Sequence, residues 1–339
     1  MPLENFTAAT GRDLFLVPRL DDDENELAAQ FNVSLYQHDR VGRAPDYGIT
    51  GVAPQVGKTR GLEHNARFIA ESAWLPGLTP AEFYDSYTRR LFGDAAAGSI
   101  MKAYLDLEAA DMFLGLETPA EDVGHCFCGI GNFLNYADSR DINELKQFHH
   151  QNRPLDGPAF PGWNISQEAE SPRMKQYGFR TARFREAIRR YEGCLELLRS
   201  SRPGVPAGAG AELEYLLWKT ESFVLHLRTL CSLMLGHTAY DAAFRARRHG
   251  RWDEAADRFG ECGVLFGDAV ALAEATAQHM STGIDDPTER HILFRYNVRI
   301  VLPIREFAKY IRNIVNYHRG LAYWETPDWD VVDPPWPPM

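Results

Sequence analysis

The chain has 339 residues, of which 45% are hydrophobic and 24% charged, and its net charge at pH 7 is −11. This composition is sufficient for a buried core of globular size. The acidic balance disfavours non-specific binding to nucleic acid or to an anionic membrane, because both require a basic surface. The five cysteines are an odd number at irregular spacing, so the sequence predicts no disulfide framework.

Two further features bear on the compartment. The N-terminal segment MPLENFTAATGRD has no basic stretch followed by an apolar run, so no signal peptide is predicted. The most apolar helical pattern, residues 215–235, contains Lys219, Glu221, His226 and Arg228. These charged and polar residues favour a core helix over a membrane span. The compartment itself is not indicated, and the cytoplasm is the default expectation.

The first part of the chain, from Asp13 to Trp74, has the pattern of a β/α repeat. Three apolar runs, at 13–20, 32–36 and 49–53, each end in polar or charged residues, and a helical pattern from Leu62 closes the segment. Apolar runs without alternation are typical of strands that are buried on both faces of a parallel sheet. Because a closed barrel needs eight such strands, about three βα units predict a partial (β/α) barrel.

After Trp74 the pattern is helical. Thr79-Pro80-Ala81-Glu82 is a capping box, and Gly93 should end the helix that it begins. Residues 151–180 are rich in Pro, Gly and Asn and predict a long loop. Further helices are predicted at 99–114, 182–200, 211–248, 251–280 and 286–318, the last with a kink at Pro303. Their short polar connections favour a helical bundle.

The predicted fold class is therefore mixed and mainly α, a partial barrel followed by a large helical bundle. The predicted domains are residues 1–75 for the barrel part and 76–320 for the helical part. Residues 321–339 form a tail that contains three Trp and five Pro. A tail with this many apolar residues is expected to dock on the rest of the protein.

Several phrases of the sequence resemble a known family. They are PRLDDDE, QFNVSLYQHDR, GVAPQ and RGLEHNARFIAESAW, followed by LTPAEFYDSYTRRLFG. Together they resemble the C-terminal half of the barrel in TIM-barrel glycoside hydrolases of the α-glucuronidase and β-hexosaminidase-like superfamily, with its helical C-terminal domain. The resemblance covers about residues 13–115 closely and the remainder only in architecture.

The resemblance implies a carbohydrate-active protein, the C-terminal portion of an O-glycoside hydrolase, with the general acid outside this chain. The implied partners are a carbohydrate and either a second chain that supplies the missing strands or further copies of this chain. No nucleic acid, membrane or cofactor is implied. Two alternatives are a non-catalytic helical interaction or scaffold protein with a vestigial barrel edge, and a sugar-binding module without hydrolysis.

The candidate catalytic residues are Asp39 and Asp22. Sites in such barrels lie at the C-terminal ends of strands, and glycoside cleavage needs two carboxyl groups beside the bond. Asp39 follows the second apolar run, and Asp22 lies in the acidic run after the first. The structural alternatives are a turn residue paired with Arg40 for Asp39, and a helix N-cap for Asp22.

The remaining candidates are substrate-binding residues. Three of them have a structural alternative: pairing with an acidic neighbour for Arg19, stabilisation of a helix N-terminus for Glu63, and an inter-domain plug for Trp74. An aromatic face such as that of Trp74 also suits stacking on a sugar ring. The predicted set is Arg19, Asp21, His38, Arg60, Glu63, His64 and Trp74.

A metal site is not predicted. His125, Cys126 and Cys128 lie close together in the sequence, but structural zinc normally uses Cys pairs with wider spacing and four ligands. The sequence also lacks a Gly-rich phosphate loop, a G-x-S-x-G elbow and an H-E-x-x-H motif, which disfavours nucleotide, serine-hydrolase and metalloprotease chemistry.

Overall fold

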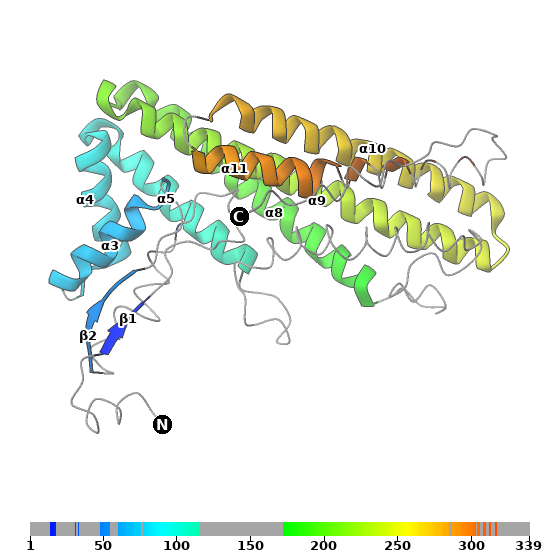
Figure 1. Ribbon diagram of the computed structural model, residues 1–339, viewed down its shortest axis with the longest axis horizontal. Coiled ribbons are helices and arrows are strands. Elements are labelled where there is room, and N and C mark those ends of the chain that lie inside the picture. Colours follow the sequence, from blue (N-terminus) through cyan, green and yellow to red (C-terminus); the bar gives the residue numbers. More distant parts are fainter. Residues whose placement is uncertain are drawn as a thin grey trace. The chain divides into compact units, whose positions relative to one another are not determined.

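The structure is a computed structural model of the whole chain (Figure 1). The residues that it describes are 14–17, 31, 33, 48–54, 60–75, 77–115, 172–284 and 287–302, together with 304, 305, 308, 309, 312 and 316. These residues are mostly helical, with two short strands. None of the helices in this part of the chain is long and apolar enough to cross a membrane.

The sheet consists of strands β1 (Leu14–Leu16) and β2 (Ile49–Val52), which pair in parallel. Both lie inside predicted strands, and their parallel pairing confirms the predicted orientation. The second predicted strand, residues 32–36, is wrong at Val33, which is helical and fully buried. A short apolar run does not distinguish a buried strand from a buried helix, and the other residues of this run lie outside the described residues. The described residues therefore show a mainly helical protein with a two-stranded sheet, and they do not show a barrel.

Helices α3 (Glu63–Trp74), α4 (Pro80–Phe92) and α5 (Asp94–Gly115) follow the sheet. The capping box that begins α4 is confirmed: the Thr79 hydroxyl accepts from the Glu82 N–H at 3.2 Å, and the Glu82 carboxylate accepts from the Thr79 N–H at 3.0 Å. This exchange satisfies two backbone donors of the first turn.

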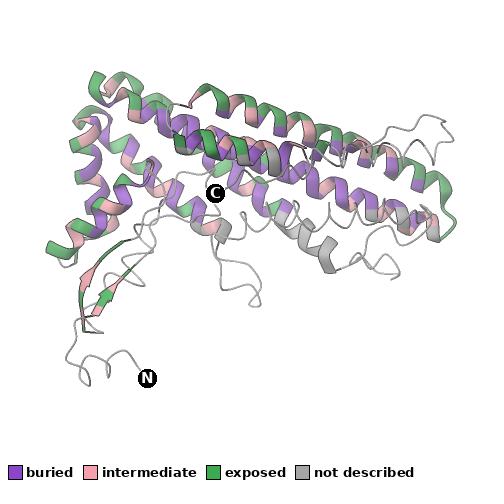
Figure 2. Ribbon diagram, viewed as in Figure 1, coloured by how far each residue is buried: buried purple, intermediate pink, exposed green. Residues whose placement is uncertain are grey.

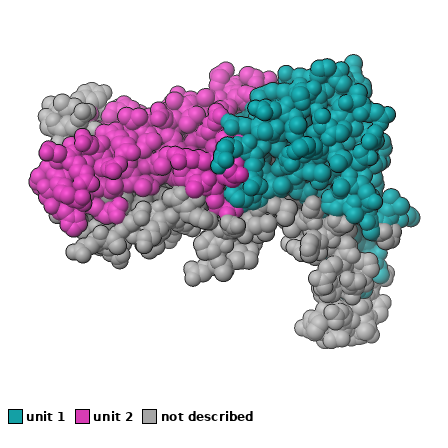
Figure 3. All heavy atoms as spheres, turned by 180° about the vertical axis from the view of Figure 1, so that it is seen from behind, with its two compact units in different colours: residues 1–129, 189–221 teal, residues 130–188, 222–339 magenta. Residues whose placement is uncertain are grey.

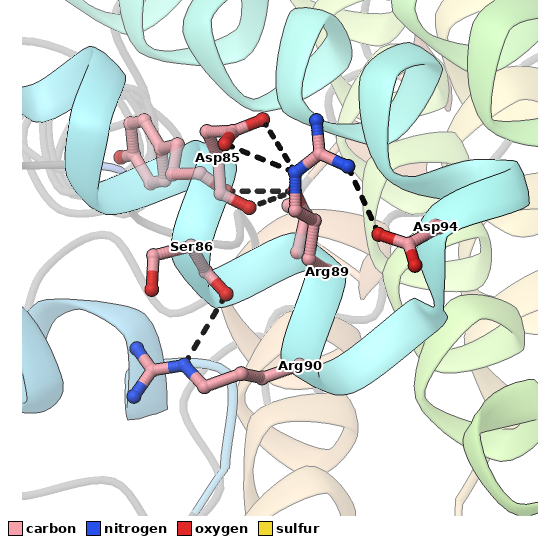
Figure 4. Close-up of polar contacts among 7 residues, drawn as sticks. Asp85, Ser86, Arg89, Arg90 and Asp94 are labelled. Carbon is pink, nitrogen blue, oxygen red and sulfur yellow. Dashed lines mark hydrogen bonds and ion pairs between the residues drawn. The ribbon is translucent and has the colours of Figure 1, made fainter.

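The corner between α4 and α5 is formed by a glycine and an arginine. Gly93 has a φ of 78°, a left-handed conformation that glycine adopts without strain, and it ends α4 as predicted. The Arg89 guanidinium binds Asp85 one turn earlier on α4 at 3.0 Å and Asp94 at the start of α5 at 2.9 Å (Figure 4). All three side chains are exposed, so this network fixes the direction of the corner more than it stabilises the fold.

An aromatic cluster joins these three helices. Phe68 of α3 meets Phe83 of α4 edge-on, with ring centroids 5.3 Å apart, and Tyr84 of α4 meets Tyr104 of α5 edge-on at 5.5 Å. These rings are buried, and such pairs contribute about 0.5–1.5 kcal/mol each beyond their buried area. The helices on both sides of the loop at residues 75–79 thus share one core.

The next elements are α8 (Pro172–Ser201), the 3-10 turns η5 (Arg202–Gly204) and η6 (Ala207–Ala209), and α9 (Gly210–Arg248). The loop predicted for 151–180 is wrong for its last nine residues, because α8 begins at Pro172. Proline at the first helical position loses no hydrogen bond, which suits this start. Helix α9 has buried residues on all its sides, so it is a central helix rather than one with a single apolar stripe (Figure 2).

Helix α10 (Trp252–Thr282) packs on α9 through a regular heptad seam. Tyr240 of α9 meets Phe259 of α10 at 6.0 Å, and His237 meets Phe266 at 5.1 Å. Gly236 leaves room for Phe266, since a Cβ there would lie 2.8 Å from the ring. The buried residues of α10 alternate at spacings of four and three, as in a coiled coil: Ala255, Phe259, Cys262, Phe266, Ala269, Ala273, Thr276 and Met280.

The last described helical segment is irregular. Helix α11 (Pro287–Tyr296) passes into a π-helical turn, η7 (Asn297–Val301). The predicted kink at Pro303 lies outside the described residues.

The chain divides into two compact units (Figure 3). Unit 1 comprises Met1–Gly129 and Arg189–Glu221, and unit 2 comprises Ile130–Ile188 and Ser222–Met339. The divisions at 188/189 and 221/222 fall inside α8 and α9, so each of these helices contributes residues to both units. The predicted domain limit near residue 75 lies within unit 1.

Candidate functional site

The candidate site lies where the chain enters α3, in unit 1. Gly61 has a φ of 82°, and a Cβ at this position would lie 3.2 Å from the Tyr215 hydroxyl oxygen. The positive φ favours glycine at this position, and a Cβ would also make a tight contact with Tyr215. The Gly61 N–H donates to the Glu63 carboxylate at 2.9 Å. This bond and the positive end of the helix dipole hold the Glu63 side chain at the start of α3.

Arg60 joins this turn to the first turns of α9. Its guanidinium donates to the Ala211 carbonyl at 3.5 Å, lies 3.7 Å from the Glu212 carboxylate, and stacks over the Tyr215 ring at 4.0 Å from the centroid. The Arg60 and Glu212 side chains are 22% and 29% exposed, so the pair is partly shielded from water. Cation–π stacking and a partly desolvated ion pair each stabilise this junction more than an exposed pair would.

Two carboxylates, Glu63 and Glu212, act on each other at this junction. Burial raises the pKa of Glu212, the negative charge of Glu63 raises it further, and Arg60 lowers it. Both carboxylates also raise the pKa of the Tyr87 hydroxyl, after the larger effect of burial, while Arg67 lowers it. Glu63, Glu212 and the Arg67 guanidinium therefore all act on Tyr87. Of the two acids, Glu212 retains its proton to higher pH than a free carboxyl group does.

His64 lies in the core of unit 1. Its ring is 4% exposed and stacks on Phe31 with centroids 4.5 Å apart, and Tyr104 lies beyond at 5.7 Å. The predicted role of His64 as a substrate-binding residue is not supported by this position. Successive side chains on a helix point about 100° apart, so His64, which follows the exposed Glu63, points into the core.

Trp74 lies at the opposite end of α3 from Arg60 and Glu63. Its side chain is 86% exposed, so the alternative role of a buried inter-domain plug is excluded by the structure. The twelve residues of α3 separate its two ends by about 17 Å at 1.5 Å per residue. Trp74 is therefore free to stack on a sugar, but not on one that contacts Glu63 directly.

The other predicted site residues lie outside the described residues. These are the candidate catalytic residues Asp39 and Asp22 and the candidate substrate-binding residues Arg19, Asp21 and His38. Their predicted roles stay predictions. Of the predicted set, the structure brings together Arg60 and Glu63.

Sequence reasoning missed Glu212 and Tyr215, which complete the junction. They lie about 150 residues after Arg60, on a helix that the sequence assigns to a separate domain. The glutamate near the start of α9 is a local signal of a helix N-terminus, and by itself it indicates only that. Its approach to Arg60 is a tertiary contact that no local pattern predicts.

The chemistry available at this junction is that of acid and base groups with a hydrogen-bonding cation. Among the described residues, no three His, Cys, Asp or Glu side chains are grouped to hold a metal ion. Comparisons with models of known protein families, with curated proteins and with solved structures found no match to this chain. The geometry of the junction is therefore the structural basis for a proposed function.

Proposed function

We propose that the protein is carbohydrate-active and of the glycoside hydrolase type, and that its sugar contacts the junction of Arg60, Glu63 and Glu212. The observation that supports this most directly is the electrostatic coupling of two carboxyl groups, one of which has a raised pKa. Glycosidases use such a pair, in which one carboxyl group donates a proton and the other acts as base or nucleophile. In this proposal Glu212 is a candidate general acid within the chain, as an alternative to one supplied from outside it.

The charge balance of the junction favours a neutral sugar. Glu63 and Glu212 are matched by Arg60 and Arg67, and Arg90 is already bound to Glu71 at 2.7 Å. With no excess of positive charge, the junction offers little attraction for the carboxylate of a uronic acid. It does offer charged donors and acceptors for hydroxyl groups, which form stronger hydrogen bonds than neutral ones.

A second candidate is a non-catalytic interaction protein. It is supported by the exposed apolar side chains in the first 75 residues, Phe15, Val17, Trp74 and Leu75. Exposed apolar groups of this size often mark contacts with a partner. A third candidate is a sugar-binding module without hydrolysis. It would bind a sugar at the junction without using Glu212 as a general acid.

The test is turnover and binding of a panel of neutral aryl glycosides and of glucuronides by the full chain. Glu212→Gln should reduce turnover by about 10²-fold or more, the usual contribution of a general acid, and Glu63→Gln should have a comparable effect. Asp39→Asn tests the predicted catalytic aspartate in the same assay.

The matched control is Glu214→Gln. Glu214 lies two residues from Glu212 on α9, is exposed, and binds Arg202 at 2.7 Å rather than Arg60. Turnover should be unchanged in this variant. If the folded wild-type chain binds sugars without turnover, the binding module is correct. If it neither binds nor cleaves them, the proposal is wrong and the interaction protein is favoured.

A further inference from the structure

A second group of acidic residues lies inside unit 1, apart from the junction. Asp111, near the end of α5, is buried, and its carboxylate connects three parts of the chain. One oxygen accepts a hydrogen bond from the Tyr191 hydroxyl of α8, and the other accepts from the backbone N–H of Phe31 at 3.4 Å. Each of these partners is 80 residues away in the sequence, so one side chain holds three distant segments together.

Phe31 is held at this point by its ring as well as by its backbone. The ring is 1% exposed and packs against His64 at 4.5 Å and against Tyr104, edge-on, at 4.9 Å. The N–H donated to Asp111 is consequently removed from water. A buried N–H that loses its acceptor is unfavourable, so Asp111 contributes to the stability of this arrangement.

A second carboxyl group near Asp111 disfavours its negative charge. Glu108, one turn earlier on α5, is also buried and raises the pKa of Asp111. The Tyr84 hydroxyl of α4 is also buried, and burial, followed by the charge of the nearby Glu108, raises its pKa. Among the described residues, the titratable groups that interact with Asp111 or with its partners include Glu108, Tyr104, Asp106 and Lys102 of α5, Tyr84 of α4, Tyr191 and Cys194 of α8, and His64 of α3.

Burial raises the pKa of Asp111 to about 7, against the opposing effect of the hydrogen bonds from Tyr191 and Phe31. In an opened state, with the side chain in water, the carboxyl group would have the ordinary pKa of about 4. The closed state therefore binds a proton more tightly than the opened state does. Between these two values, opening must release a proton.

We propose that Asp111 is a pH-responsive tie in unit 1, which holds Phe31 against α5 and α8 more firmly when its carboxyl group is protonated than when it is ionised. The sign follows from the proton balance: lowering the pH favours the closed state, and raising it favours the opened one. Opening should increase about tenfold per pH unit between about pH 4 and pH 7 and be constant above that range.

The test is hydrogen exchange of the Phe31 amide in the full chain, monitored by NMR. The rates are corrected for the intrinsic pH dependence of exchange. Opening should be about 50-fold more frequent at pH 7 than at pH 5. Asp111→Asn keeps the shape and cannot ionise, so its opening should not depend on pH. Asp106→Asn is the control, because Asp106 is on the same helix and more exposed, and binds Lys102. It should behave as the wild type does.

Tyr191→Phe is a second variant that keeps the carboxyl group and removes one of its donors. Because that donor favours the ionised form, the upper limit of the pH-dependent range should move to higher pH. This variant decides the question if Asp111→Asn does not fold. The proposal is overturned if Phe31 exchange in the wild type is independent of pH, or if the pH dependence persists unchanged in both variants.

Discussion

The two units bury titratable groups of opposite charge type. In unit 1 the group is Asp111, whose pKa burial raises to about 7. In unit 2 it is His226 of α9, which is fully buried and whose pKa burial lowers to about 3. Its Nδ1 lies 3.3 Å from the Tyr296 hydroxyl, and its Nε2 has no hydrogen-bond partner in the described part of the chain.

The comparison shows that one physical cause gives opposite pH responses. Removal from water disfavours the charged form of either group, which is the anion of Asp111 and the cation of His226. The folded state of unit 1 therefore retains a proton that the unfolded chain releases, and loses stability as the pH rises from about 4 to about 7. The folded state of unit 2 excludes a proton that the unfolded chain accepts, and loses stability as the pH falls below 6.5.

The largest predicted effect in this comparison is the loss of stability of unit 2 at acidic pH. Between pH 6.5 and pH 4, His226 should cost unit 2 about 3 kcal/mol of unfolding free energy, because the unfolded imidazole is protonated and the folded one is not. His226→Leu should remove this part of the pH dependence. Urea unfolding at a series of pH values, monitored by hydrogen exchange of the α10 backbone amides, measures this pH dependence.

The control for this variant is His249→Leu, at the exposed C-terminal side of α9. Its pH dependence should match that of the wild type. An acid response that is the same in His226→Leu and His249→Leu would contradict the role of His226.

A smaller effect concerns packing in unit 2. Gly236→Ala places a Cβ 2.8 Å from the Phe266 ring, so the ring must move and unfolding free energy should fall by about 1–2 kcal/mol. Gly260→Ala is the matched variant on α10, where a Cβ meets nothing within 4 Å. It should stabilise by about 0.5–1 kcal/mol through helix propensity.

Gly98→Ala makes the same comparison in unit 1. It lies on α5, and a Cβ there also meets nothing within 4 Å. Thermal unfolding of all three glycine variants measures the series. Destabilisation by Gly260→Ala or Gly98→Ala equal to that by Gly236→Ala would show that the contact with Phe266 is not the cause.

The smallest predicted effect is local to unit 1. Thr79→Ala removes the side-chain acceptor of the capping box and should lower the unfolding free energy by about 1 kcal/mol. Ser86→Ala, in the exposed middle of α4, should raise the unfolding free energy by a few tenths of a kcal/mol. The loss should be independent of pH from 6 to 8, unlike the effects of Asp111 and His226. Chemical denaturation of both variants at these pH values tests the distinction.

The parts of the fold that the sequence predicted correctly are those with local causes. The start of α4 at Thr79 and its end at Gly93 follow from the capping box and from a glycine with positive φ. The helix from Leu62 to Trp74 and the parallel strands around Phe15 and Gly51 follow from the spacing of apolar residues. In each case the signal lies within a few residues of the element that it predicts, although the pairing of the two strands joins residues 14–16 to residues 49–52.

The parts that could not be predicted depend on contacts between distant segments. Val264 of α10 is 64% exposed although it is strongly apolar, while the small residues Ala255, Cys262 and Thr276 are buried. The heptad position decides this, and hydrophobicity alone does not reveal it. The same limit applies to the candidate site, where His64 is in the core and Glu212 reaches Arg60 from a helix about 150 residues away.

The way the chain passes between the units has a consequence for fragment design. Unit 1 requires residues from Arg189–Glu221, which include Tyr191, Leu195 and Tyr215 of its core. A fragment that ends at Gly129 would lack them. A fragment that begins or ends at 188/189 or at 221/222 would interrupt helix α8 or helix α9. Expression of either unit alone therefore requires a rearranged gene with a new linker, and a simple truncation should yield protein that does not fold.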